Sequence, residues 1–268
     1  MLYNAKNGTV PIDGTEMCYA SFGHGKKVLA VLPGLSDGLA TVSGKALILA
    51  PPYRDHFDEY TVYMFSRRNE LPQGFTIRDM AADQARALKA LGIEKADVMG
   101  VSQGGMIAQC IAADFPEIVD KLVLVVTAPR VNEISSKCVG YWIELAEKGD
   151  HKQIMIDTAE KSYTPEKLEK YRRVYPVLGR VGKPKSYDRF LVNARAILGF
   201  DATDEIKKIA CPTLILGGGD DKIVGGEASR ELNSLIPGSK LIMYPELGHA
   251  LYEEAKDFYK QVFDFLDS

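Results

Sequence analysis

The sequence predicts an α/β fold with a mostly parallel central sheet and helices on both of its faces. Short apolar runs rich in β-branched residues recur along the chain, as strands covered on both faces do. Segments with helical periodicity separate most of these runs, and a helix is the usual crossover between parallel strands. Between about residues 130 and 208, however, only helical segments follow one another. That stretch predicts a helical insertion into the sheet domain.

Six apolar runs are the predicted strands. They occupy residues 27–32, 60–65, 96–101, 121–126, 212–216 and 239–244. Ahead of them, residues 15–23 predict an antiparallel lead-in to the sheet. One large sheet domain suits a chain of 268 residues, which is long enough to bury a sizeable core.

The clearest predicted helix outside the insertion covers residues 76–92. Thr76 and Asp79 occupy the two positions of a capping box, and Gly92 marks the end. One face of this helix is apolar and consists of Ile77, Met80, Ala81, Ala87, Leu88 and Leu91. Residues 252–268 predict a single amphipathic helix that closes the chain.

Four helical segments make up the predicted insertion. They are residues 133–149, 152–163, 165–178 and 186–199. We therefore expect a core of residues 1–129 and 209–268 and a helical cap of residues 130–208. Since the cap leaves after one predicted parallel strand and returns before another, we expect it to lie at the carboxyl edge of the sheet.

The composition excludes several classes of function. With 46% hydrophobic and 26% charged residues the chain is typical of globular proteins, and a net charge of −3 provides no broad basic surface for nucleic acid. No apolar run approaches the ~18 residues of a membrane span, and the N-terminal residues lack the pattern of a secretory signal. We therefore expect a cytoplasmic protein that binds no nucleic acid. A homo-oligomer is left open.

The cysteines predict neither a disulfide framework nor a metal site. The four of them, at 18, 110, 138 and 211, show neither paired nor metal-ligand spacing. Buried thiols are the expectation, and no metal or other cofactor is predicted.

A serine between two glycines follows the predicted strand 96–101. The spacing Gly100-x-Ser102-x-Gly104 places Ser102 in a tight turn from strand to helix. Glycines two residues before and after relieve the crowding of such a turn, and the hydroxyl is left exposed at the carboxyl end of the strand. The pattern predicts a nucleophile.

A serine nucleophile needs a general base and an acid that orients the base. Only four histidines exist, at 24, 56, 151 and 249. His249 follows the strand 239–244, and Asp221 follows the strand 212–216, so both lie at the same edge of the sheet as Ser102. Asp220, directly beside Asp221, is the alternative acid.

Taken together, these segments resemble the α/β-hydrolase superfamily over nearly the whole chain. The matching pieces are "GVSQGG" (100–105), "GGGDDKIV" (217–224) and "PELGHALYEE" (245–254). The resemblance implies the α/β-hydrolase fold and a catalytic triad of Ser102, Asp221 and His249. The usual spacing from Gly218 selects Asp221 over Asp220.

The resemblance also implies an oxyanion hole and no cofactor. The backbone N–H groups of Gln103 and Leu35 are the expected donors. Two segments depart from the usual pattern. Pro33-Gly34 stands where His-Gly is common, and "FSRRNELPQGF" (65–75) replaces a glycine-rich motif. The first departure bears on Leu35, whereas the second leaves the triad untouched.

The predicted function is that of a serine hydrolase. Residues 100–129 are similar to small esterases, enol-lactonases and C–C hydrolases. We expect cleavage of a carboxylic ester, or a related lactone or thioester, of a small or medium substrate through an acyl-enzyme. The alternatives are C–C hydrolysis or acyl transfer with the same triad, and a ligand receptor on the same fold. A haloalkane dehalogenase is disfavoured because it needs an aspartate at position 102.

Two further sites are predicted from the sequence. In the cap, Trp142 is the leading candidate for contact with the substrate. Arg67 and Arg68 follow a predicted strand, and we expect them at the solvated surface, with contact to a substrate carboxylate as the alternative.

Overall fold

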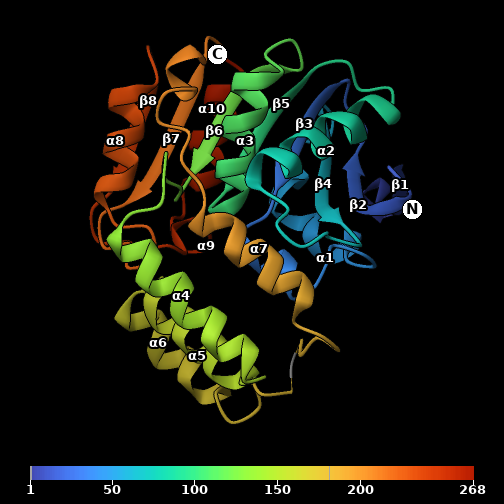
Figure 1. The fold of residues 1–268 in the computed structure, drawn as a ribbon. Coiled ribbons are helices and arrows are strands. Elements are labelled where there is room, and N and C mark those ends of the chain that lie inside the picture. Colours follow the sequence, from blue (N-terminus) through green and yellow to red (C-terminus); the bar gives the residue numbers. More distant parts are fainter. Residues whose placement is uncertain (1, 181) are drawn as a thin grey trace.

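An eight-stranded sheet forms the centre of the molecule (Figure 1). The computed structural model describes residues 2–180 and 182–268. The strands follow the spatial order β1-β2-β4-β3-β5-β6-β7-β8. Their bounds are β1 Lys6–Ile12, β2 Thr15–Gly23, β3 Lys27–Leu32, β4 Tyr60–Arg68, β5 Ala96–Val101, β6 Val119–Val125, β7 Thr213–Gly218 and β8 Lys240–Tyr244. The predicted α/β fold with a mostly parallel sheet is confirmed.

Parallel pairing runs through the strands from β4 to β8, whereas β1 and β2 are antiparallel. The six predicted strands and the antiparallel lead-in are all present. Strand β1 was not predicted, because its sequence KNGTVPI carries a glycine and a proline and few apolar residues. It lies at the sheet edge, where a proline is tolerated because no further strand needs its missing N–H.

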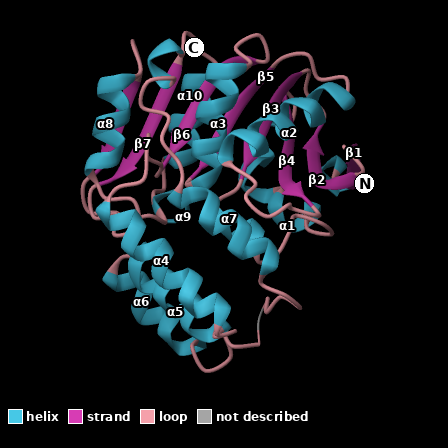
Figure 2. Cartoon of the chain, in the orientation of Figure 1, coloured by secondary structure: helices cyan, strands magenta, loops and turns pink. Residues whose placement is uncertain are grey.

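Helices cover both faces of the sheet, which explains why its central strands are apolar throughout (Figure 2). On one face lie α2 (Ile77–Ala90), α3 (Gln103–Asp114) and α8 (Glu227–Leu235), and their buried side chains form one core cluster with the sheet. On the other face, α1 (Ala46–Leu49) and α10 (Phe258–Leu266) belong to a second cluster. The predicted capping box of Thr76 and Asp79 starts α2.

The closing segment is two helices, so the prediction of a single helix was wrong. Helix α9 (Leu251–Glu254) is followed by Ala255, whose backbone is extended with ψ of 115°. Helix α10 then begins at Phe258, and Phe258 and Phe263 are almost fully buried in the second cluster. The break lets the chain turn from the sheet edge onto the sheet face. A periodicity that continues across the break gave no sign of it.

Four helices that follow β6 and precede β7 in the sequence gather at one end of the sheet (Figure 1). They are α4 (Glu133–Glu147), α5 (His151–Ser162), α6 (Pro165–Tyr171) and α7 (Asp188–Leu198), which correspond to the four helical segments of the insertion. Where this helical segment leaves and rejoins the sheet domain, Arg130 forms an isolated antiparallel β-bridge with Asp201, and the N–H of Val131 donates to the carbonyl of Phe200. The two ends of the helical segment are therefore hydrogen-bonded to each other.

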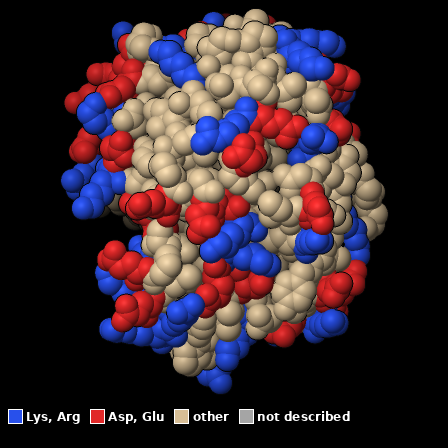
Figure 3. Space-filling view, turned by 90° about the vertical axis from the view of Figure 1, so that its left-hand side faces the viewer, with Lys and Arg blue, Asp and Glu red and all other residues tan. Residues whose placement is uncertain are grey.

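The surface carries charges of both signs. Figure 3 shows acidic and basic side chains interspersed on one face of the molecule, without a large area of one sign. No helix within residues 2–180 and 182–268 is long and apolar enough to cross a membrane.

Candidate active site

Ser102 occupies the sharp turn between β5 and α3. Its backbone is strained, with φ of 54° and ψ of −120°, in a region that residues with a side chain rarely adopt. Two contacts hold the turn: the N–H of Ser102 donates to the carbonyl of Val125 at 2.9 Å, and the N–H of Gly105 donates to the carbonyl of Ser102 at 2.8 Å. The strain is therefore fixed by the neighbouring strand and by the first turn of the helix.

The glycines around Ser102 are required by close packing. A Cβ on Gly100 would clash with the carbonyl of Gly104, and a Cβ on Gly104 would clash with the carbonyl of Leu32. Helix α3 thus lies close to β5 and β3, and only glycine fits at either position.

Ser102, His249 and Asp221 form a continuous hydrogen-bonded chain. Nε2 of His249 lies 2.9 Å from Oγ of Ser102, and Nδ1 of His249 lies 2.7 Å from Oδ2 of Asp221. With a proton on Nδ1, the imidazole donates to the carboxylate and leaves Nε2 free to accept from the hydroxyl. This is the arrangement of a nucleophile, a general base and an orienting acid.

Asp221 is held as a buried carboxylate. Burial by itself would raise its pKa, but the charge and hydrogen bond of His249 and two backbone N–H groups outweigh burial and lower the pKa. Those N–H groups, of Ile223 and Val224, donate to Oδ1 at 2.8 and 3.0 Å. The neighbouring Asp220 is half exposed and pairs with Lys222 at 3.2 Å. The structure therefore brings Asp221, and not Asp220, to His249.

The loop that carries His249 is braced by helix α5. The N–H of Ala250 donates to the carbonyl of Ser162 at 3.0 Å. Gly248 passes so close to the same carbonyl that a Cβ there would lie 2.7 Å from its oxygen. Position of the imidazole thus depends on contact between the core and the helices inserted after β6.

Leu35 and Gln103 both lie near Ser102. Leu35 begins the 3₁₀ turn Leu35–Gly38, just after Gly34, whose Cα approaches the Ser102 side chain. Gln103 is the first residue of α3. Among the described residues, neither amide N–H donates to another protein group. The two N–H groups predicted as oxyanion-hole donors thus have no competing acceptor in the described part of the chain.

A cavity of about 170 Å³ opens beside Ser102 and His249. Core residues and residues of α4, α5 and α7 line it together. Its apolar lining consists of Leu35, Leu39, Val101, Trp142, Ile154, Met155, Phe190, Ile223 and Tyr252. Ser36, Thr158 and Ser162 add hydroxyl groups, and within residues 2–180 and 182–268 no aspartate, glutamate, lysine or arginine lines the cavity.

Trp142 is one wall of this cavity. Its side chain is buried, and its indole N–H donates to Oδ2 of Asp157 at 2.7 Å. Lys161 donates to the same carboxylate oxygen at 2.6 Å. The hydrogen bond to the Asp157–Lys161 pair thus fixes the orientation of the indole ring, which lines the cavity.

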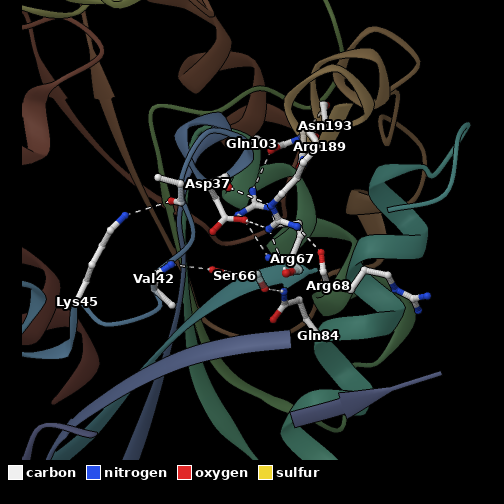
Figure 4. A network of polar contacts seen from close by, with 11 residues as sticks. Asp37, Val42, Lys45, Ser66, Arg67, Arg68, Gln84, Gln103, Arg189 and Asn193 are labelled. Carbon is white, nitrogen blue, oxygen red and sulfur yellow. Dashed lines mark hydrogen bonds and ion pairs between the residues drawn. The ribbon is translucent and has the colours of Figure 1, made fainter. Parts of the chain in front are cut away.

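Arg67 and Arg68 are not at the surface, so that prediction was wrong. Both are buried, and neither lines the cavity. Strand β4 continues to Arg68, three residues beyond its predicted end, and carries both side chains into the interior. Arg68 forms a two-pronged hydrogen bond to Asp83 of α2. Arg67 instead contacts Gln103 and Asp37, as Figure 4 shows.

Other residues add little that could hold a cofactor. Cys18, Cys110 and Cys138 are buried free thiols, and Cys211 is partly buried. In the part of the chain that the structure describes, no group of three or more histidine, cysteine, aspartate or glutamate residues could hold a metal ion.

Comparison with known proteins agrees with this architecture. Residues 38–256 match the family model described as "alpha/beta hydrolase fold". A Klebsiella pneumoniae subsp. pneumoniae protein named "Putative carbamate hydrolase RutD" is 29% identical over 185 residues, which cover 67% of this chain and 68% of the relative. A protein of the same name from Caulobacter sp. is 26% identical over 245 residues, covering 87% and 89%.

Solved structures are similar over almost the full chain. The enol-lactonase from Burkholderia xenovorans LB400 superposes with a TM-score of 0.81 at 23% identity, covering 97% of this chain and 100% of the other. An alpha/beta hydrolase enzyme from a Medee basin deep-sea metagenome library gives a TM-score of 0.83 at 19% identity, covering 97% and 98%. At such identities the likeness concerns the fold.

Proposed function

The chain belongs to the alpha/beta hydrolase fold family, and from that premise we propose that it is a serine hydrolase. Its substrate is a small or medium carboxylic ester, or a related lactone or thioester. The observation that carries the proposal is the hydrogen-bonded chain from Ser102 through His249 to Asp221, which ends at an apolar cavity.

In the proposed reaction a proton passes through His249 twice, once in each half of the cycle. Oγ of Ser102 attacks the carbonyl carbon while its proton passes to Nε2, and the tetrahedral intermediate expels the alcohol, which takes that proton. Water then gives a proton to Nε2 and attacks the acyl-enzyme. Collapse of the second intermediate returns the proton to Oγ of Ser102 and releases the acid. Asp221 keeps Nδ1 protonated and stabilises the imidazolium.

Gln103 and Leu35 form the oxyanion hole in this proposal. Both residues lie near Ser102, and their amide N–H groups have no acceptor among the described residues, which supports the assignment. Donors fixed in place before the reaction stabilise the developing charge without reorganisation, and one such donor is typically worth about 10²–10³ in kcat.

The cavity favours a compact, uncharged acyl or leaving group. Its volume of about 170 Å³ is below the ~300–1,000 Å³ of pockets for drug-sized ligands. A carboxylate or ammonium group placed in its apolar part would have no charged partner among the lining side chains.

The helical insertion acts as a cap in this proposal. Residues 130–208 form the cap, and residues 1–129 and 209–268 form the core. Trp142, Ile154 and Phe190 from the insertion lie in the same cavity as Ser102, which supports a role in substrate selection.

Carbamate hydrolysis is the second candidate. The names of the two relatives favour it, and a carbamate presents the same kind of carbonyl to Ser102 as an ester does. Hydrolysis of C–C bonds and acyl transfer are alternative reactions of the same triad. A ligand receptor with the same fold is a further alternative.

A substrate panel tests the proposal. We expect repeated turnover of p-nitrophenyl esters from acetate to laurate, with the short chains preferred, and a loss of at least about 10³-fold in kcat in Ser102→Ala. A p-nitrophenyl carbamate in the same panel ranks the second candidate. A single slow turnover with a large ligand-induced rise in melting temperature would indicate a receptor instead. Retention of more than about a tenth of the rate in Ser102→Ala would reject the nucleophile.

A further inference from the structure

Arg67 is a buried cation at the carboxyl end of β4. Its side chain is 1% exposed. Burial lowers the pKa of its guanidinium to about 10, although the nearby Asp37 acts in the opposite direction. Nε and Nη1 of Arg67 have no hydrogen-bond partner among the described residues. Since an apolar side chain of similar size is often at least as stabilising in such a place, stability alone does not account for the arginine.

The contacts of Arg67 reach both segments that flank Ser102 (Figure 4). Nη2 of Arg67 donates to Oε1 of Gln103 at 3.0 Å. The backbone N–H of Arg67 donates to Oδ2 of Asp37 at 3.0 Å, and Nη1 lies 3.9 Å from the same oxygen. Asp37 belongs to the 3₁₀ turn that Leu35 begins. One residue thus links the two turns that carry the free amide groups.

Helix α7 joins the same network from the other side. Nε2 of Gln103 donates to the carbonyl of Asn193 at 2.8 Å. Nη2 of Arg189 donates to Oδ2 of Asp37 at 2.6 Å and to the carbonyl of Arg67 at 3.1 Å. Because Gln103 and Asp37 each contact both Arg67 and α7, a shift of α7 would disturb both turns at once.

We propose that Arg67 is a positioning residue that holds the two oxyanion-hole turns in register and couples them to the docking of α7. The inference rests on the proposed function for the meaning of the hole, and on the contacts of Arg67 for the coupling. The hole is complete only while α7 lies against the core. Cap movement and transition-state stabilisation are therefore linked through a residue that touches neither substrate nor triad.

The first test compares kcat with the affinity for a transition-state analogue. We expect Arg67→Met to lower kcat for p-nitrophenyl acetate about 10- to 100-fold with KM changed less than about threefold, because misplaced donors act on the oxyanion and not on the bound ester. Affinity for a trifluoromethyl ketone, whose adduct with Ser102 carries an oxyanion, should fall by a similar factor. Arg67→Lys, which keeps the charge, should restore part of both.

Arg68→Met is the matched control, because it removes the neighbouring buried arginine and its bond to Asp83 without touching Gln103 or Asp37. Its kcat should stay within about twofold of wild type even where its melting temperature falls as much as that of Arg67→Met. An equal loss of kcat in the two variants, or a rise in KM of Arg67→Met without a fall in kcat, would overturn the positioning role.

The second test, hydrogen–deuterium exchange, needs no turnover. Arg67→Met should speed exchange at least threefold in peptides from the Leu35–Gly38 turn and from α7, while Arg68→Met leaves both unchanged. Unchanged exchange in Arg67→Met would reject the coupling whatever the activity. Wild-type protein without any hydrolase activity would reject the proposed function, and the exchange result would still decide the coupling.

Discussion

Asp220 and Asp221 are adjacent, yet they lie in opposite environments. Asp221 is buried with three hydrogen-bond donors, whereas Asp220 faces solvent beside Lys222. We expect Asp221→Asn to lower kcat about 10⁴-fold, because the amide favours the wrong tautomer of His249. Asp220→Asn should stay within about twofold. The comparison of kcat in the two variants checks the acid, and similar losses would contradict its assignment to Asp221.

Asp97 lies at the end of β5 that is opposite Ser102, and we expect it to make the stability of the protein depend on pH. Burial raises its pKa to about 6, and its Oδ1 has no partner among the described residues. In the unfolded chain the carboxyl titrates near its ordinary value of 3.8. The folded state therefore binds the proton more tightly, and stability falls as the pH rises from about 4 through 6.

Replacement of Asp97 by asparagine removes that titration. Asp97→Asn should gain up to about 3 kcal/mol in the free energy of unfolding at pH 8, since each pKa unit is worth about 1.4 kcal/mol, and most of the gain should vanish by pH 4. Asp58→Asn is the control, because the side chain of Asp58 is 95% exposed and its carboxylate already lies in solvent. Urea denaturation at several pH values measures the difference. A gain independent of pH would show that charge burial is not its cause.

At the level of residues, the strand ends indicated Ser102 and His249 and the family resemblance selected Asp221, but nothing in the sequence indicated the residues that support them. Ser102, Asp221 and His249 each follow a recognisable apolar strand, so the shared edge of a parallel sheet brings them together. Arg67 gave no such signal. Whether a residue at the end of a strand is buried depends on what packs over it, here Asp37 and α7, which come from distant parts of the sequence.

Among the elements, the strand-turn-helix around Ser102 depends most strictly on its glycines. Gly104→Ala should destabilise the protein by about 1–3 kcal/mol, because its Cβ would clash with the Leu32 backbone, which has little room to move. Gly140 in the middle of α4 is the control: a Cβ there meets nothing within 4 Å. Gly140→Ala should stabilise by about 0.5–1 kcal/mol. Thermal denaturation checks both, and two changes of the same sign would refute this packing.

Strand β1 and the break at Ala255 escaped the sequence analysis for different reasons. Strand β1 is held by pairing with β2 along its whole length, from Lys6 with Ser21 to Ile12 with Thr15, and such pairing leaves no local pattern in a polar sequence. The break at Ala255 is set by the change of direction between the sheet edge and the sheet face. The long helices and buried strands, whose patterns are local, were predicted nearly to their ends.

On the scale of the whole molecule, helices α4, α5 and α7 line the cavity beside Ser102 together with residues from the rest of the chain, and Trp142 tests the role of these helices. Trp142→Leu should enlarge the cavity and shift preference toward longer acyl chains at least about fivefold in kcat/KM, while p-nitrophenyl acetate changes less than twofold. Tyr141→Leu is the control, because Tyr141 is 38% exposed and does not line the cavity. An identical profile in the two variants would exclude a role of this wall in specificity.

The central claim is that Ser102 is the nucleophile of the whole assembly, and covalent labelling tests it most directly. A fluorophosphonate should add to wild-type protein in a ratio of one to one, and fragmentation of the labelled peptide by mass spectrometry should locate the adduct at Ser102. Ser102→Ala should remain unlabelled, and His249→Ala should be labelled more slowly by at least about 10²-fold, since it retains the hydroxyl but lacks the base. An adduct on another residue, or equal labelling of Ser102→Ala, would contradict the account.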